Sequence, residues 1–217
     1  MVPSLTTYIE GLLKELDALP PARKNRLERL ATYLRASEPG VPQLVFVCTH
    51  NSRRSQIAQV WAAVAAAYYG IDLRTYSGGT ETTAFNPRAV AALRRAGFTI
   101  DDAPGENPHY RVTYADRLPA LACWSKTYDD PANPVRDFAA IMTCAEADAD
   151  CPFIPGAALR LSLTYEDPKE ADGTEQEAAR YDERVRQIGT EVFYAMRSAK
   201  AEPPPGDEDR YPRTLYL

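Results

Sequence analysis

The sequence has little cysteine, no surplus of positive charge and no long apolar run. It holds 4 cysteines in 217 residues, and its formal net charge is −5 at pH 7. This charge argues against a broad nucleic-acid surface, because such surfaces need clustered lysine and arginine. If the protein binds an anion, it must build the positive potential locally.

Signals for membrane insertion or export are also missing. The longest nearly uncharged apolar stretch, IAQVWAAVAAAYYG at residues 57–70, is shorter than the roughly 18 residues that a membrane span needs. Glu10, Lys14 and Glu15 stand where a signal peptide would have its apolar region. We therefore expect a cytoplasmic protein without a membrane partner. In such a reducing compartment, cysteines serve catalysis, redox chemistry or packing more often than structural disulfides.

What the chain does contain, from residue 43 onward, is an alternation of strand and helix patterns. This alternation predicts an α/β fold of three layers, α/β/α, with a central four-stranded parallel sheet. The predicted strands are 44–48, 73–79, 138–144 and 159–165, and the predicted helices are 55–69, 86–97 and 174–198. Short strands and turns are expected in the Pro-, Tyr- and Asp-rich segment 107–133.

The two ends of the chain differ from this central part. Residues 1–40 form an N-terminal helical extension, in which leucines recur at helical spacing on both sides of the Pro20-Pro21 break. A main domain is expected over residues 41–200. Residues 201–217 form a tail that begins as a solvated linker and ends in aromatic and apolar residues.

The most informative motif, CTHNSRRS, runs from Cys48 to Ser55 between an apolar strand and a helix. A loop of this length must curl, and its backbone N–H groups and the helix N-terminus would then point at a tetrahedral oxyanion. Arg54 is placed to bind two oxygens of that anion, whereas Arg53 is expected to point to solvent. The same positive surroundings would favour the nucleophilic thiolate of Cys48. The candidate binding residues are Thr49, His50, Asn51, Ser52, Arg53, Arg54 and Ser55.

Four segments together carry a resemblance to a known family. FVCTHNSRRSQIAQVW, SGGT, FNPRAVAALRRAGF and YEDP resemble the low-molecular-weight tyrosine phosphatase superfamily, which includes the thioredoxin-coupled arsenate reductases. The similarity covers about residues 43–198, which makes residues 41–200 the expected catalytic domain with that fold.

The resemblance implies a role for each residue of the site. Cys48 is the nucleophile, Arg54 binds the oxyanion, Asn51 shapes the loop and Ser55 hydrogen-bonds the nucleophilic sulfur. Asp167 is the general acid that protonates the leaving oxygen. No cofactor and no metal ligand are implied.

His50 departs from the family, which usually has glycine at this place. The loop or its entrance is therefore expected to differ. His50 could gate the pocket or stabilise the Cys48 thiolate.

Two further cysteines, Cys144 and Cys151, are separated by six residues in MTCAEADADCPFIPG. This segment resembles the redox segment of the arsenate reductases. If 144–151 were one helix, its rise would hold the two Cα atoms about 10 Å apart, beyond the roughly 7 Å that a disulfide tolerates. Oxidation would therefore unwind the segment, and the weak helix formers Asp148 and Asp150 suit that, as residues solvated rather than packed. Cys123 is expected to be a small buried residue.

The resemblance implies reduction of arsenate through a Cys48, Cys144 and Cys151 disulfide cascade, recycled by thioredoxin or a similar dithiol protein. The alternative is a phosphatase that hydrolyses phosphomonoesters through a Cys48 thiophosphate. Phosphatases usually carry a tyrosine soon after the Asp-Pro pair, whereas Lys169 and Glu170 follow Pro168 here, which favours a small anion. A noncatalytic phosphate or redox sensor is a third reading.

Overall fold

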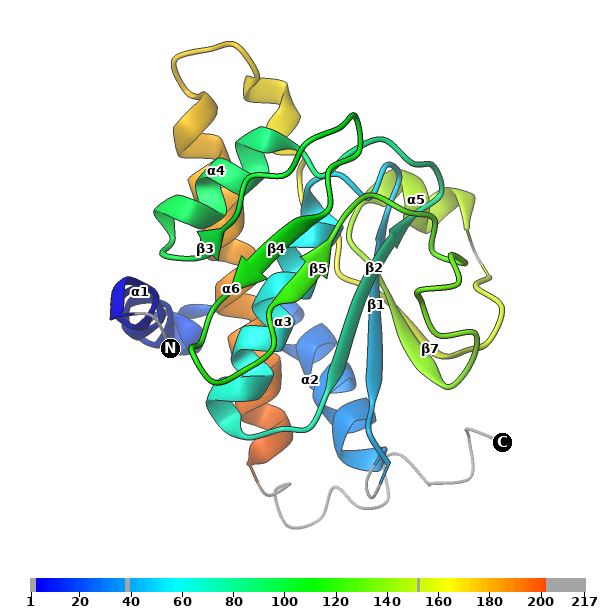
Figure 1. Ribbon diagram of the computed structural model, residues 1–217. Coiled ribbons are helices and arrows are strands. Elements are labelled where there is room, and N and C mark those ends of the chain that lie inside the picture. The colour runs from blue at the N-terminus through cyan, green and yellow to red at the C-terminus, as the bar shows by residue number, and fades with distance from the viewer. Residues whose placement is uncertain (1–2, 38–39, 152, 202–217) are drawn as a thin grey trace.

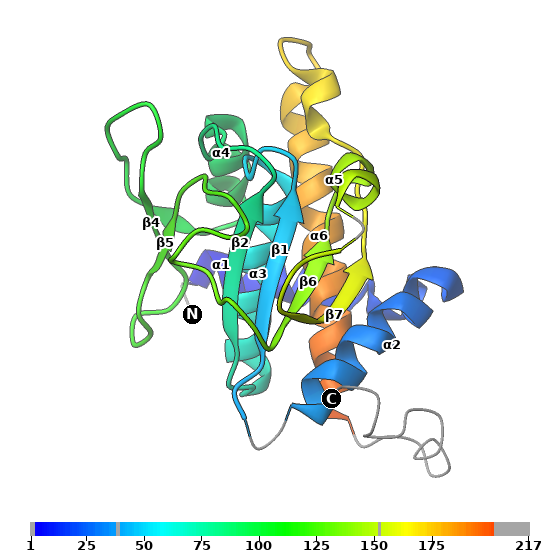
Figure 2. The same ribbon diagram turned by 90° about the vertical axis from the view of Figure 1, so that its right-hand side faces the viewer.

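Four parallel strands form the centre of the computed structural model, which describes residues 3–37, 40–151 and 153–201. Their order is β2-β1-β6-β7, and all three pairings are parallel. The strands are β1 (Gln43–Cys48), β2 (Arg74–Gly79), β6 (Phe138–Met142) and β7 (Ala157–Ser162). The inner strands β1 and β6 read as unbroken apolar runs because both of their faces are covered. Figures 1 and 2 show the sheet from two sides.

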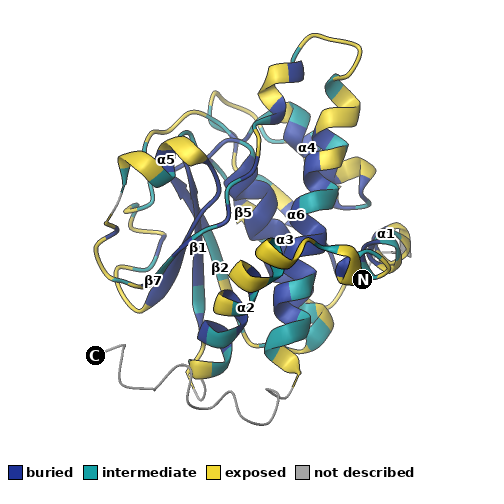
Figure 3. Ribbon diagram, turned by 180° about the vertical axis from the view of Figure 1, so that it is seen from behind, coloured by how far each residue is buried: buried dark blue, intermediate teal, exposed yellow. Residues whose placement is uncertain are grey.

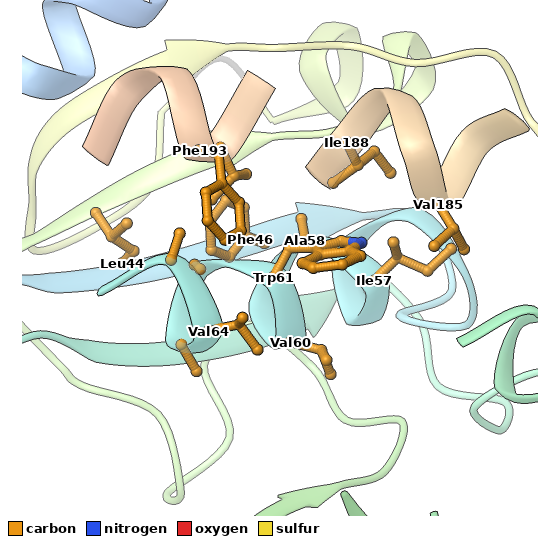
Figure 4. Packing of buried hydrophobic residues seen from close by; sticks show 14 of the residues in the cluster. Leu44, Phe46, Ile57, Ala58, Val60, Trp61, Val64, Val185, Ile188 and Phe193 are labelled. Atoms are coloured by element: carbon orange, nitrogen blue, oxygen red, sulfur yellow. The ribbon is translucent and has the colours of Figure 1, made fainter. Parts of the chain in front are cut away.

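One face of the sheet is covered by a layer of helices. Its central members are α3 (Arg54–Tyr69) and α6 (Glu177–Lys200), which pack on each other, and α4 (Pro87–Arg95) lies against α6. Trp61 of α3 is fully buried and meets Phe193 of α6 edge to face, with 6.0 Å between the ring centroids. Figure 4 shows labelled side chains of β1, α3 and α6 gathered in one apolar cluster. This packing fixes the N-terminus of α3 beside the end of β1.

The other face has a thinner cover. A second apolar cluster there joins Val45, Val47 and Met142 of the sheet to Ala147 and Ile154. Ala147 belongs to the short helix α5 (Ala145–Asp150), which lies at the carboxyl end of β6. Viewed from behind, buried residues gather on the strands and on α3, whereas α5 is largely exposed (Figure 3).

The N-terminal extension packs on the helical face and shares its core. It consists of α1 (Pro3–Leu13), the 3-10 turn η1 (Leu16–Ala18) and α2 (Pro21–Ala36). Tyr8 of α1 stacks on Trp61 with 5.7 Å between the ring centroids, and Leu12 and Leu30 are fully buried in the same cluster. The two predicted N-terminal helices are therefore present, and both of them pack against α6.

Three short antiparallel strands, β3 (Thr99–Ile100), β4 (Tyr110–Thr113) and β5 (Leu121–Cys123), form a second sheet. The strands β4 and β5 confirm the expectation of short strands in the 107–133 segment, whereas β3 precedes that segment. The chain then returns to the main sheet, where Thr127 forms an isolated parallel bridge with Gly79. The segment between β5 and this bridge lies against the loop that follows β1.

The structure confirms the predicted three-layer fold and four-stranded parallel sheet, with small shifts of the element ends. The last strand begins at Ala157 and ends at Ser162, so residues 163–165 continue as a loop that leads to the 3-10 turn η2 (Pro168–Ala171). The closing helix starts at Glu177 instead of Thr174. Within the described residues no helix is long and apolar enough to span a membrane. The predicted tail lies, apart from Ala201, outside the described residues.

Candidate active site

Cys48 is the last residue of β1, and its side chain faces the N-terminus of α3. Its Sγ lies 3.1 Å from Oγ of Ser55, which is the second residue of that helix. Cys48 is 3% exposed and Ser55 is fully buried. This is the contact that the resemblance implies for a nucleophilic sulfur.

Asn51 fixes the shape of the loop between them. Its backbone has a φ of 45°, in the left-handed region that asparagine tolerates better than most residues. Its Nδ2 donates to Oγ of Ser55 at 2.8 Å, while its Oδ1 accepts hydrogen bonds from the backbone N of Lys126 and from Nε2 of Gln56. Nε2 of Gln56 also donates to the carbonyl of Trp124 at 2.7 Å. The loop is thus held in one conformation by buried side chains.

The backbone N–H groups of this loop are available to a ligand. None of those at positions 50–53 donates a hydrogen bond to another residue within the ranges that the structure describes. The carbonyls, by contrast, are used: that of His50 accepts from Ser125 Oγ at 2.8 Å, and that of Ser52 accepts from the N–H of Asn86 at 2.9 Å. A curled segment with paired carbonyls and unpaired N–H groups is an anion-binding concavity.

Arg54 is buried at the first position of α3 and reaches the loop after β7. Its Nη1 donates to the carbonyl of Tyr165 at 2.9 Å, and its Nη2 donates to Oδ2 of Asp167 at 2.7 Å. Its Nε is buried and has no hydrogen-bond partner in the described part of the chain. The structure therefore brings Arg54, Asp167 and Cys48 together at the carboxyl end of the sheet, where ligands bind in open α/β folds.

The prediction that Arg53 points to solvent is wrong. Its side chain is 11% exposed, and its Nε donates to the hydroxyl of Tyr181 at 2.8 Å. That hydroxyl donates in turn to Asp172 at 2.8 Å, and Nη2 of Arg53 lies 3.5 Å from the same carboxylate. Arg53 thus links the loop of residues 49–53, called the anion loop below, to Tyr181 of α6 and to Asp172, which follows the segment that carries Asp167.

The side chain of His50 lies at the rim of the loop. It is 45% exposed, and its Nε2 lies 3.5 Å from Oε2 of Glu81. Its partner is therefore Glu81, not Cys48, which favours a place at the pocket entrance over direct contact with the thiolate. The hydroxyl of Ser52 is engaged elsewhere, because it donates to the carbonyl of Ala84 at 2.7 Å.

Cys144 is in direct contact with the anion loop. It follows β6, the neighbour of β1, and its Sγ lies 3.5 Å from Oγ1 of Thr49. Cys144 is also the N-cap of α5, because its Sγ accepts the backbone N–H of Ala147 at 3.4 Å. It is fully buried, and burial raises the pKa of its thiol above the usual range, an effect that the contacts with Thr49 and Ala147 partly offset.

Cys151 stands at the opposite end of α5 and is partly exposed. Arg160 of β7 holds this end: its Nε donates to the carbonyl of Cys151 at 3.0 Å, and its Nη2 donates to Oδ1 of Asp148 at 2.7 Å. The expectation that Asp148 is merely solvated is therefore wrong. We expect that unwinding of α5 would break the Arg160 contacts.

Cys123 is a buried residue, as predicted. It is fully buried in β5, and burial raises the pKa of its thiol to about 12. A thiol with this pKa stays neutral near pH 7 and is a poor nucleophile.

The loop that follows β1 packs so closely on Gly79, the last residue of β2, that it leaves no room for a side chain there. A Cβ there would lie 2.6 Å from the carbonyl oxygen of Thr49 and 2.7 Å from the backbone N of Asn51. Both are backbone atoms, so no rotamer change relieves the overlap. We expect Gly79→Ala to lower the free energy of unfolding by about 2 kcal/mol in urea denaturation. We also expect it to weaken phosphate binding, measured as protection of Cys48 from iodoacetamide.

Gly11→Ala is the control for this substitution. Its Cβ would meet only the far end of Arg186, at 3.4 Å, and alanine is favoured over glycine within a helix by up to about 1 kcal/mol. This variant should be at least as stable as wild type and should bind phosphate equally well. A Gly79→Ala protein with wild-type protection by phosphate would refute the proposed fit between β2 and the loop.

Several residues of the site were not found from the sequence. Tyr165, Tyr181 and Asp172 contact the two loop arginines, and Gln56 and Lys126 contact Asn51. All but Gln56 come from segments far along the chain. The signal available for Tyr165 and Asp172 was their nearness to the Asp-Pro pair.

Comparison with known proteins agrees with this geometry. The family model for low molecular weight phosphotyrosine protein phosphatase matches residues 43–116. An arsenate reductase from Bacillus licheniformis is 31% identical over 150 residues, which is 69% of this chain and 91% of that protein. An arsenate reductase from Bacillus subtilis has the same identity and coverage.

Among solved structures, a thioredoxin-dependent arsenate reductase from Corynebacterium glutamicum matches with 24% sequence identity. The match covers 78% of this chain and 70% of that chain, with a TM-score of 0.39. The assignment of this chain rests on the sequence relatives and on the Cys48 loop. The chain belongs to the low molecular weight phosphotyrosine protein phosphatase superfamily, in the branch that contains these arsenate reductases.

Proposed function

We propose that this protein reduces arsenate to arsenite, with Cys48 as the nucleophile and Cys144 and Cys151 as the thiols that carry the electrons onward. The observation that carries the proposal is that an oxyanion site and a second cysteine lie next to each other around the sulfur of Cys48. Unpaired N–H groups and the buried Arg54 surround Cys48, and a second cysteine, Cys144, lies directly behind the loop at Thr49. An anion site and a redox site are thus adjacent.

The first step forms a bond between sulfur and arsenic. Arsenate binds to the loop N–H groups and Arg54, Cys48 attacks arsenic, and one hydroxyl group of arsenate takes a proton from Asp167 and departs as water. An anion that takes two donors of Arg54 must share or displace the Asp167 contact at Nη2. Anion binding would in this way release the carboxyl group beside the leaving oxygen. Asn51 and Ser55 hold the loop and the sulfur in place during this step.

The next steps transfer two electrons. The Cys144 thiolate attacks Sγ of Cys48, the electron pair of the sulfur–arsenic bond stays on arsenic, and arsenite leaves as a disulfide joins the two cysteines. Cys151 then attacks Sγ of Cys144 and returns Cys48 to the thiolate. Burial raises the pKa of the Cys144 thiol, so its proton must be removed before or during this attack.

The final disulfide, between Cys144 and Cys151, needs an external reductant. We propose a dithiol protein of the thioredoxin type, which fits the partly exposed position of Cys151 and the thioredoxin dependence stated for the Corynebacterium glutamicum relative. Such a cycle requires a reducing compartment, which we propose is the cytoplasm. Residues 41–200 would form the catalytic domain, with residues 1–40 as its helical extension.

A phosphatase is the second candidate, because the matching family model carries that activity in its description. The same loop and general acid would form a Cys48 thiophosphate, which water would then hydrolyse. That reaction has no use for Cys144 or Cys151.

A coupled assay separates the two candidates. The protein is mixed with arsenate, thioredoxin, thioredoxin reductase and NADPH, and NADPH loss is followed. We expect sustained consumption that depends on arsenate. Absence of arsenate turnover together with rapid hydrolysis of phenyl phosphate would favour the phosphatase and contradict the reductase.

A further inference from the structure

We infer that the N-terminal extension positions the oxyanion arginine, and that Arg23 of α2 does so through Glu191 and Tyr165. Arg23 is a positioning residue in this scheme, since it touches neither the anion nor Cys48. The inference deepens the proposed function, because it takes the Cys48 loop as the oxyanion site. The family model begins at residue 43, so α2 lies outside the part of the chain that it matches.

The first contact joins the extension to α6. Nε of Arg23 donates to Oε1 of Glu191 at 2.8 Å, and Nη2 of Arg23 lies 2.7 Å from Oε2. The side chain of Glu191 is 2% exposed and that of Arg23 is 15% exposed. A carboxylate this deeply buried is stable only with a counter-ion. Within the described ranges, Arg23 is the basic residue that forms an ion pair with Glu191.

The second contact joins α6 to the loop after β7. The hydroxyl of Tyr165 donates to Oε2 of Glu191 at 2.9 Å. The guanidinium of Arg23 also lies over the ring of Tyr165, 4.8 Å from the ring centroid. Tyr165 is thus held at its ring and at its hydroxyl by two residues from different helices, one of which belongs to the extension.

The third contact reaches the active site through the backbone. The carbonyl of Tyr165 accepts from Nη1 of Arg54 at 2.9 Å, and Tyr165 stands two residues before Asp167, which accepts from Nη2 of the same arginine. A shift of Tyr165 would therefore move both partners of Arg54 together. Because Arg54 must present a planar pair of donors to the anion, a small rotation of its guanidinium weakens binding.

Oxyanion binding at Cys48 provides a test that does not need arsenate turnover. The rate of Cys48 alkylation by iodoacetamide is measured by peptide mass spectrometry at increasing phosphate concentrations, and the concentration that halves the rate is compared between variants. In Arg23→Gln it should rise about tenfold, which corresponds to one lost charge-assisted hydrogen bond. Arg23→Lys should recover most of this loss, because its ammonium group still neutralises Glu191.

Tyr165→Phe tests the same path without unpairing a buried charge. It removes the hydroxyl that donates to Glu191 but keeps the ring under Arg23. The phosphate concentration that halves the rate of Cys48 alkylation should rise about threefold. If Arg23→Gln does not fold, this variant decides the matter. No change in Tyr165→Phe would then contradict the inference.

Leu12→Ala is the matched control. Leu12 is fully buried between the extension and α6, where its Cδ1 lies close to Gly189, and it makes no polar contact on the path to Tyr165. Its truncation should destabilise the packing of the extension about as much as the loss of the buried ion pair does. The phosphate concentration that halves the rate of Cys48 alkylation should nevertheless stay within about twofold of the wild-type value. Equal weakening in Leu12→Ala and Arg23→Gln would overturn the inference, as would unchanged protection in Arg23→Gln.

The outcome is independent of the reductase proposal. If wild type fails to reduce arsenate but Arg23→Gln weakens phosphate protection, the positioning role stands and the proposed function falls. If arsenate is reduced and Arg23→Gln protects Cys48 as wild type does, the positioning role falls alone.

Discussion

Arg54→Lys is expected to lose about a thousandfold in kcat/KM for arsenate, the largest effect of any conservative substitution outside the cysteines. Arg54 makes two directed contacts, to the carbonyl of Tyr165 and to Asp167, and keeps a buried Nε–H without a protein partner. A lysine ammonium cannot hold the carbonyl, the carboxylate and two anion oxygens in one plane. Both the affinity for arsenate and the placement of the general acid should suffer.

Arg53→Lys is the matched comparison, since the two arginines are neighbours and similarly buried. Arg53 donates to Tyr181 and lies beside Asp172, so its replacement should loosen the Asp167 loop and cost only about tenfold in kcat/KM. The initial rate of NADPH loss at several arsenate concentrations gives both values, with a thermal melt to show that each variant folds. A larger loss in Arg53→Lys than in Arg54→Lys would mean that the oxyanion arginine has been misassigned.

Cys151→Ser is expected to release no more than a single arsenite per protein molecule and then stop. In the proposed cycle, the first turnover leaves a disulfide between Cys48 and Cys144. Both of these residues are buried, at 3% and 0% exposure, so a dithiol protein cannot reach that disulfide. Only attack by Cys151, which is partly exposed, would carry the oxidised sulfur to the surface.

Arsenite release in a rapid-quench experiment, together with mass spectrometry of the product, checks this expectation. The stalled variant should contain the Cys48–Cys144 disulfide in amounts that match the arsenite released. Cys123→Ala is the control: Cys123 lies in β5 with a pKa near 12, outside the path, and this variant should turn over continuously. Continuous turnover in Cys151→Ser would rule out the cascade.

The strand, loop and helix around Cys48 could be predicted because their determinants are local. An apolar run ends at the cysteine, asparagine supplies the left-handed residue of the loop, and the helix begins at Arg54. The same is true of α4, where Asn86 caps the helix by accepting the N–H of Arg88 and Pro87 occupies the first position. Each of these signals acts within a few residues of the element that it specifies.

Contacts between distant segments could not be predicted from one sequence. The orientation of Arg53 depends on Tyr181, 128 positions further along the chain, and the loop is closed by Lys126, 75 positions from Asn51. Arg23 and Glu191 are 168 positions apart. Neither residue type nor spacing reveals such pairs, and a lone arginine at a helix start has solvent as its commonest neighbour.

One atom of this site serves both chemistry and architecture. Sγ of Cys144, the proposed electron carrier, accepts the N–H of Ala147 in the first turn of α5. Once that sulfur is bonded to another sulfur and turned towards it, the helix start loses its acceptor and the segment is easier to melt. Oxidation would thereby trigger its own conformational change, so that Cys151 becomes mobile after arsenic has been reduced and not before.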